Sequence, residues 1–153
     1  MKRNGILAAA GLLPLAAGYL VNGAMLAVPS VPGGIWCLLG GALLILWGRL
    51  AYGLADPGRS ALLQALLLSA VGLGMLALVL YQELVQGAYW SNLVGIGSQL
   101  YFLPFLSLAS LLFGGLIQLV DPVIRVWPFY LFVWAALFLT AFLGCRVKGR
   151  ANG

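Results

Sequence analysis

The sequence predicts an all-α integral membrane protein, a bundle of about five transmembrane helices. Of its 153 residues, 63% are hydrophobic and only 7% are charged, whereas a soluble domain has about 25% charged residues. The apolar residues gather in runs of about 20 or more, the length that a helix needs to cross the hydrocarbon core. These runs leave no room for a soluble domain, so we expect residues 1–153 to form a single transmembrane helical domain.

The first predicted span covers residues 5–28 and follows a short basic start. A basic start before an apolar run is also typical of a cleaved signal peptide, which would remove about the first 24 residues. The run is longer than the usual apolar region of such a peptide, and Asn22 stands where a small residue should precede the cleavage site. We therefore favour an uncleaved span.

The second and third predicted spans are residues 35–54 and 57–81. Two prolines and two glycines in residues 29–34 predict the turn before the second span. Between the two spans stands Asp56-Pro57. Aspartate favours the N-cap of a helix, and proline favours its first turn, so we expect the third span to begin here.

The fourth and fifth predicted spans are residues 93–120 and 128–145. Residues 82–92 are the most polar internal stretch and indicate a loop or an interfacial helix. The fourth run is longer than one perpendicular span, which predicts a tilt, and Pro104 predicts a kink within it. Four or six spans remain as alternatives, and six would require residues 82–120 to cross twice. The basic tail after residue 145 is expected to be mobile.

The basic residues stand at the ends of the apolar runs, the placement expected for side chains that contact anionic lipid headgroups rather than nucleic acid. Five spans place the two termini on opposite sides. The positive-inside rule then favours a cytoplasmic N-terminus in a cell membrane, either a bacterial inner membrane or a plasma membrane. That orientation has five basic residues inside, Lys2, Arg3, Arg49, Arg59 and Arg125, and three outside, Arg146, Lys148 and Arg150. The basic tail does not fit this orientation, and would fit an even number of spans.

The chain has two cysteines and no histidine. With five spans, Cys37 and Cys145 would lie on the same side and would be able to pair in an oxidising compartment. We favour two free, buried thiols that behave as small hydrophobic residues. No metal-ligand spacing is present, so no metal and no cofactor is expected.

Two aspartates suggest an intramembrane enzyme as one alternative. Asp56 and Asp121 each precede a proline at the predicted inner end of a helix, and two close carboxyl groups that share a proton can act as a catalytic pair. Helix capping explains each aspartate locally, so we expect no enzymatic activity.

Four amides within the apolar runs are candidate ligand-binding residues, namely Asn22, Gln64, Gln99 and Gln118. A buried amide is costly unless it is paired, so each should face the interior of the bundle. There it would either hydrogen-bond between helices or line a cavity for a solute or a lipid headgroup. Tyr89, Trp90 and Tyr101, with the neighbouring Phe102, are candidates for lining an apolar pocket.

The function expected first is that of a non-enzymatic subunit or accessory protein of a membrane complex. Small residues at helical spacing would allow close packing within the chain, in a homo-oligomer, or with another membrane protein. They are Ala61, Ala65 and Ser69, then Ala70 and Gly74, then Ser110 and Gly114. The alternatives are a small channel, transporter or lipid- or apolar-ligand-binding protein, and an intramembrane enzyme using Asp56 and Asp121.

Overall fold

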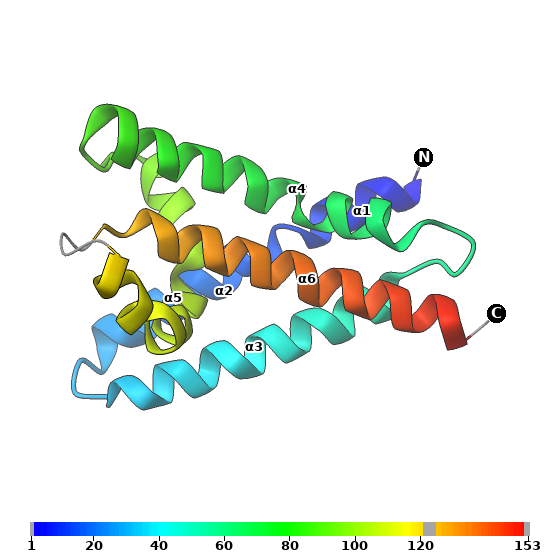
Figure 1. Cartoon of the computed structure of the whole chain (residues 1–153), viewed down its shortest axis with the longest axis horizontal. Helices are drawn as coiled ribbons and strands as arrows, with labels where there is room; N and C mark the ends of the chain where they lie inside the picture. The colour runs from blue at the N-terminus through cyan, green and yellow to red at the C-terminus, as the bar shows by residue number, and fades with distance from the viewer. Residues whose placement is uncertain (1, 121–124, 152–153) are drawn as a thin grey trace.

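A computed structural model describes the backbone of residues 2–120 and 125–151, and the side chains of residues 4–115 and 125–151. All regular elements in these residues are helical (Figure 1). They are α1 (Lys2–Ala10), α2 (Leu13–Ala27), α3 (Gly33–Leu54), α4 (Ala61–Leu80), the π-helical turn η1 (Tyr81–Gln86), α5 (Leu93–Val120) and α6 (Trp127–Ala151). Five helical stretches in this part of the chain are long and apolar enough to cross a membrane. The predicted fold class is therefore confirmed.

The two ends of the chain lie at the same end of the bundle (Figure 1). The guanidinium of Arg59, between α3 and α4, donates a hydrogen bond of 2.7 Å to Asn4 Oδ1 in α1. The ammonium of Lys148, near the end of α6, donates one of 3.2 Å to the carbonyl oxygen of Gly53 in α3. We call this end of the molecule the basic end.

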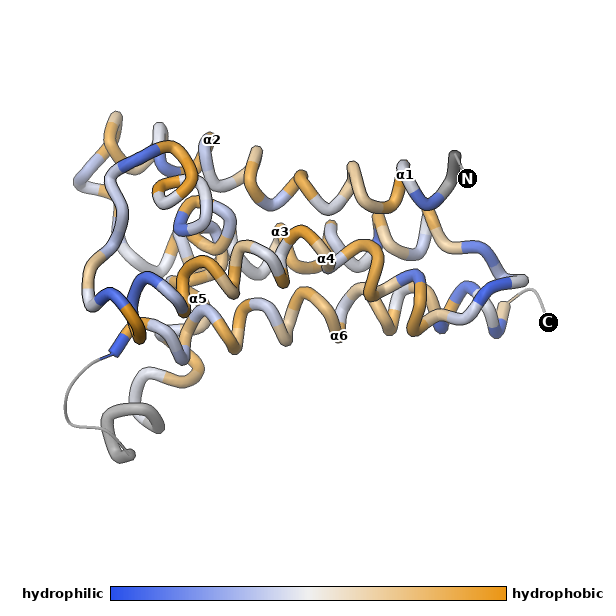
Figure 2. Tube along the Cα trace, turned by 90° about the horizontal axis from the view of Figure 1, so that it is seen from above, coloured by the Kyte–Doolittle hydropathy of each residue, from blue (hydrophilic) through white to orange (hydrophobic). Residues whose placement is uncertain are grey.

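Helix α5 lies across the other helices at the opposite end, which we call the distal end (Figures 1 and 2). Near its start, Ser98 hydrogen-bonds to Gln82 of η1. Beyond its end, the backbone N–H of Val126 donates to Glu83, also in η1. The start of α5 and the segment directly before α6 are therefore tied to the same turn of the chain. The expectation that the two termini lie at opposite ends is wrong, because α1 begins and α6 ends at the basic end. Hydropathy reports that a helix is apolar, but not its direction.

Pro104 and Gly18 explain how α5 packs across α2. A proline has no N–H, so the carbonyl oxygen four residues earlier, that of Leu100, loses its helical hydrogen bond. A Cβ at Gly18 would overlap this same oxygen, so only glycine lets α2 approach it. The close contact covers the carbonyl oxygen of Leu100, to which the Cα–H of Gly18 can act as a weak hydrogen-bond donor.

Helices α3 and α6 run in the same direction and are packed closely along their length. A Cβ at Gly144 of α6 would overlap the carbonyl oxygen of Gly48 in α3. Two turns earlier on α6, the carbonyl oxygen of Leu137 accepts a hydrogen bond of 2.9 Å from the indole N–H of Trp47. These small residues and this hydrogen bond hold the two helices together, as expected for association within lipid.

Several boundaries differ from those predicted. The first span is broken at residues 11–12, where α1 ends and α2 begins with Pro14 in its first turn. The third span begins at Ala61 instead of residue 57, with Ser60 as its N-cap, and η1 extends it to Gln86. The tail expected to be mobile continues α6 as helix to Ala151.

Candidate functional site

Gln64 holds the loop at the basic end and lines none of the cavities described below. Its side chain is 1% exposed. Its Oε1 accepts a hydrogen bond of 2.7 Å from the backbone N–H of Asp56, and its Nε2 donates to the carbonyl oxygens of Asp56 and Arg59. The amide is thus fully used in holding residues 56–59 against the start of α4.

Asp56 does not cap α4, because the helix begins at Ala61. Its Oδ1 instead accepts from the backbone N–H of Gly58, and its Oδ2 lies 3.7 Å from Nε of Arg59. The carboxylate therefore shapes the loop. Asp121 lies outside the described residues, so its predicted capping and catalytic roles remain untested. The described residues on either side of it, Val120 and Arg125, belong to the distal end.

Gln82 fastens the distal end in the same way. Its side chain is wholly buried. Its Nε2 donates to Ser98 Oγ at 3.1 Å and to a carbonyl of its own helix, and its Oε1 accepts from the backbone N–H of Trp90 at 2.8 Å. Ser98 in turn donates to the carbonyl oxygen of Gly95. One amide thus joins the end of α4, the following loop and the start of α5.

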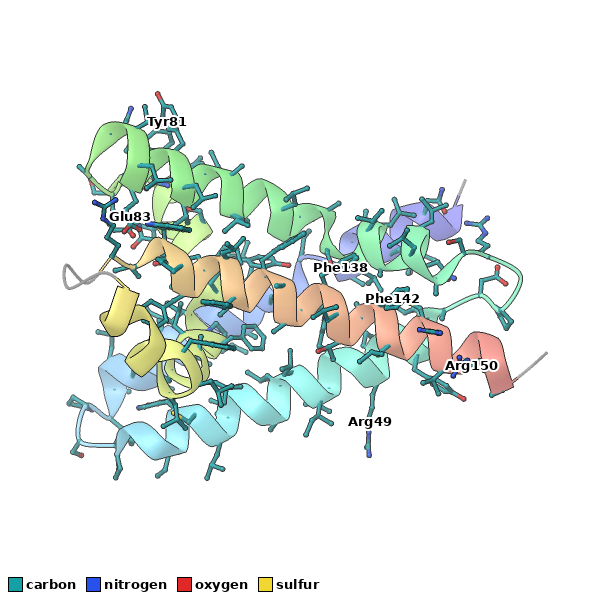
Figure 3. All side chains as sticks on the ribbon, in the orientation of Figure 1. Arg49, Tyr81, Glu83, Phe138, Phe142 and Arg150 are labelled. Carbon is teal, nitrogen blue, oxygen red and sulfur yellow. The ribbon has the colours of Figure 1, made fainter. Side chains whose placement is uncertain are left out.

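Beside it, Glu83 joins two connecting segments at the distal end (Figure 3). Its Oε2 accepts a hydrogen bond of 2.5 Å from the hydroxyl of Tyr89, and its Oε1 accepts one of 2.8 Å from the backbone N–H of Val126. Partial burial, followed by the hydrogen bond to Glu83, raises the pKa of Tyr89 well above its usual value. The carboxylate is therefore engaged in the fold.

The structure does not bring the four candidate amides together. Gln64 lies at the basic end, while Gln99 donates to the carbonyl oxygen of Gly95 in its own helix near the distal end. Asn22 is partly exposed on α2, and makes no side-chain hydrogen bond with the residues that the structure describes. Gln118 lies in α5, but its side chain is outside the described part.

The candidate aromatic residues pack against other rings. Trp90 makes an edge contact with Tyr81 at 6.0 Å between centroids, and its indole N–H donates to Gln86. Tyr101 is 1% exposed and makes an edge contact with Phe102 at 5.0 Å. Tyr89 is engaged with Glu83. These residues belong to the core and to the distal loop, and the cavities described next are lined by other residues.

An apolar groove runs between α2 and α3 and is the candidate functional site. It consists of two cavities that share Ala17 and Leu43. The first has a volume of about 260 Å³ and is lined by Leu13, Pro14, Ala17, Leu43, Leu46, Trp47, Leu50 and Phe105. The second has a volume of about 290 Å³ and is lined by Ala17, Leu20, Val21, Ala24, Leu39 and Leu43. We call the two together the α2–α3 groove.

The α2–α3 groove is deep and opens to the outside of the bundle. Leu20 and Leu46, at its edges, are 72% and 57% exposed. Trp47 and Phe105, at its floor, are each 5% exposed. The indole N–H of Trp47 is already bonded to the carbonyl oxygen of Leu137, so no polar side chain is offered to an occupant. The groove suits only an apolar ligand.

The groove exists because α2 and α3 scarcely contact each other, although a short turn joins them. α2 packs mainly on α5, and α3 packs on α6 and α5. The helix α5 therefore separates them and supplies Phe105 to the floor of the groove. The transverse position of α5 and the groove have the same structural origin.

The α2–α3 groove was not predicted from the sequence, because the residues that line it resemble a lipid-facing surface. Leu39, Leu43, Leu46 and Leu50 recur at helical spacing on α3, the same pattern that any helix shows to lipid or to a partner. The role of Gln82 was not predicted either, because residues 82–92 were expected to form a loop or an interfacial helix. A signal was present, since a glutamine directly after an apolar run can staple the next loop.

The cysteines are free thiols near opposite ends of α3. Cys37, in α3, contacts the carbonyl oxygen of Ser107, and Cys145 contacts that of Ala51. Ala51 is fourteen residues after Cys37 in the same helix, a rise of about 20 Å. A disulfide requires Cα atoms within about 7 Å, so the shared side expected from five spans is not found.

The predicted small-residue ridges are only partly in packed interfaces. Ala65 and Ser69 are buried in the core of α4. Gly74 and Ser110 are exposed, and a Cβ at Gly74 would meet no other atom within 4 Å. The closest small-residue contact is instead that of Gly48 with Gly144.

No protein-family model, curated protein or solved structure matches this chain. The functional reading therefore depends on the geometry of its own residues.

Proposed function

We propose that this protein is a non-enzymatic membrane protein that binds an apolar ligand from the bilayer in the α2–α3 groove. The observation that supports this is the groove itself, whose floor at Trp47 and Phe105 is apolar and reached from the outside. The two cavities, of about 260 and 290 Å³, are together of the size expected for a small-molecule site.

The placement of polar groups argues against a channel or a transporter. The buried amides Gln64 and Gln82 are used in fastening loops, and neither lines the α2–α3 groove. Ion and proton pathways need polar or ionisable side chains that face a cavity within the membrane. A ligand of this groove would be held by its apolar surface alone.

Quenching of Trp47 fluorescence tests this proposal. Trp47 is retained while Trp36, Trp90, Trp127 and Trp134 are replaced by phenylalanine, and the protein is reconstituted in phosphatidylcholine with brominated acyl chains. We expect strong quenching, because a chain in the groove brings bromine to the floor. Ala17→Phe, which fills the point shared by the two cavities, should protect Trp47, as should Ala24→Phe in the second cavity.

Ala70→Phe is the matched control, since Ala70 lies on an exposed face of α4 away from the groove. It should leave the quenching unchanged. Circular dichroism and a monodisperse elution profile report folding of each variant. Quenching that is equally strong in folded wild-type, Ala17→Phe and Ala24→Phe proteins would exclude occupancy of the groove.

The second candidate function is that of an accessory subunit of a membrane complex. Leu111 and Leu112, in the second half of α5, are 69% and 62% exposed at the distal end, and an exposed apolar patch of this kind is also typical of a protein contact. Stoichiometric co-purification with one membrane protein, lost in Leu111→Asn/Leu112→Asn protein, would support this function over ligand binding.

We further propose that the protein lies in a cell membrane with its basic end in the cytoplasm. Seven of the eight basic residues belong to segments at this end, and Arg125 alone belongs to the distal end. Basic residues accumulate on the cytoplasmic side of membrane proteins. The N-terminus would then be cytoplasmic, as expected from the sequence, and the C-terminus would be cytoplasmic too.

A further inference from the structure

We propose that the ligand of the α2–α3 groove is one anionic phospholipid, with an acyl chain in the groove and its headgroup at Arg49. This inference rests on the proposed function, and names the class of molecule that the groove takes.

The depth and the narrowness of the groove favour an acyl chain over a transmembrane helix of a partner. Trp47 and Phe105 line the floor and are each 5% exposed, whereas Leu20 and Leu46 at the edges are 72% and 57% exposed. A helix with its side chains is about 10–12 Å across and would rest on the edges at Leu20 and Leu46. A single file of methylene groups is narrow enough to fill the space behind them.

The direction of the groove decides where a headgroup would lie. On α3 the lining runs from Leu39, toward the distal end, to Leu50, toward the basic end. On α2 it runs from Ala24 back to Leu13. An acyl chain along this path has its headgroup at the opening between Leu13 and Leu50, at the basic end, or at the opposite opening beside Ala24.

Charge distinguishes the two openings. Arg49 stands directly before Leu50, is exposed and points away from the bundle (Figure 3). It makes no hydrogen bond or ion pair with the described residues, whereas Arg59 is bonded to Asn4 and lies beside Asp56. Residues 19–39, which include the lining of the opposite opening, contain no charged side chain. A long arginine side chain can extend along the apolar surface to a phosphate at the membrane interface.

The other basic residues also favour an anionic headgroup at the basic end. Seven of the eight basic residues belong to the basic end, and Asp56 is the one described carboxylate there. This field attracts every anionic lipid to that side of the membrane, but Arg49 is the one basic residue that directly precedes or follows a groove-lining residue in the sequence. A specific site and a diffuse field therefore make different predictions for single arginine variants.

Native mass spectrometry of the full chain in mild detergent tests the inference, with phosphatidylglycerol and phosphatidylcholine of identical acyl chains added in equal amounts. We expect the wild-type protein to retain one lipid, with phosphatidylglycerol preferred about fivefold, the effect of one basic residue near the membrane surface. Arg49→Gln should abolish the preference while one lipid is still retained. Arg150→Gln, which removes a charge from the same end of the bundle, should keep it. Glycerol phosphate, which has the headgroup chemistry without acyl chains, should not displace the lipid.

The outcomes separate the inference from the function on which it rests. Equal retention of the two lipids, or equal loss of preference in Arg49→Gln and Arg150→Gln proteins, would overturn the anionic headgroup site and leave an apolar-ligand groove. If folded Ala17→Phe and Ala24→Phe proteins retain lipid as the wild-type protein does, the groove itself is not the binding site and both proposals fail. Displacement by glycerol phosphate would indicate a phosphate site independent of the groove.

Discussion

The two ends of the bundle are fastened by the same device but carry different charge. At each end a buried glutamine binds backbone atoms of a neighbouring loop, Gln64 at the basic end and Gln82 at the distal end. Seven of the basic residues belong to segments at the basic end, and one belongs to the distal end. The comparison shows that the amides are part of the fold, and that the asymmetry between the ends is electrostatic.

This asymmetry also removes the conflict in the sequence reading. Five spans leave the basic tail on the side opposite Lys2 and Arg3. α5 lies across the distal end, whereas α1 with α2, α3, α4 and α6 run along the bundle (Figure 1). The tail then lies with the other basic residues, so that seven basic residues belong to the basic end and one belongs to the distal end.

The largest expected effect concerns the accessibility of the two ends, which should be all or none. In protein whose Cys37 and Cys145 are replaced by alanine, Gly5→Cys and Gly149→Cys introduce thiols at the basic end. Ala88→Cys introduces one in the exposed distal loop. An impermeant maleimide applied to intact cells should label the distal thiol and neither of the other two, because the basic end faces the cytoplasm.

Permeabilised cells provide the control, since all three thiols should then react. Labelling of Gly5→Cys and Gly149→Cys on opposite sides would contradict the arrangement of α5 seen here. Labelling of both from outside would keep that arrangement and reverse the proposed orientation.

Replacing Gln64 and Gln82 should show which of the two glutamines contributes more to the free energy of unfolding. Gln82→Met leaves the backbone N–H of Trp90 without its acceptor and Ser98 Oγ without the hydrogen bond that it accepts, a cost of about 1–3 kcal/mol. Gln64→Met should cost less, because water can reach the freed loop atoms of Asp56 and Arg59. Reversible unfolding in mixed detergent and SDS micelles measures both changes.

Gln99→Met is the matched control for Gln64→Met and Gln82→Met. Its amide binds only the carbonyl oxygen of Gly95, in its own helix, and its loss should change the free energy of unfolding by less than about 1 kcal/mol. An equal effect of all three substitutions would show that the interhelical bonds of Gln82 add nothing.

The smallest expected effect is on the pH dependence of the distal end. Burial and Glu83 raise the pKa of Tyr89 above that of an unfolded tyrosine, about 10. The folded state therefore binds this proton more tightly. The resulting stability is fully present below pH 10 and is lost as the pH rises above it. Tyr89→Phe removes this contribution.

Unfolding at pH 9 and pH 11 measures this effect. Between these two pH values the wild-type protein should lose more stability than Tyr89→Phe protein. A larger loss in Tyr89→Phe protein would contradict the direction of the pKa shift. Tyr19→Phe, at an exposed tyrosine of α2, serves as the control.

The sequence by itself determined that the chain forms apolar helices suited to a membrane. It also determined that only a few polar side chains need partners between these helices. Long apolar runs with few charges have no stable arrangement other than membrane helices, so the five apolar stretches follow from composition and length. The general expectation that buried amides would be paired also followed from the cost of leaving them unpaired.

Only the tertiary structure decided the direction of α5, the partners of Gln64 and Gln82, and the α2–α3 groove. A helix rich in leucine gives the same pattern whether it faces lipid, a partner helix or a cavity, because all three are equally apolar. The course of α5 depends on Pro104, which frees the carbonyl oxygen of Leu100, and on Gly18, which lets α2 cover that oxygen. This pairing joins residues 86 positions apart and is set by packing, which local sequence does not encode.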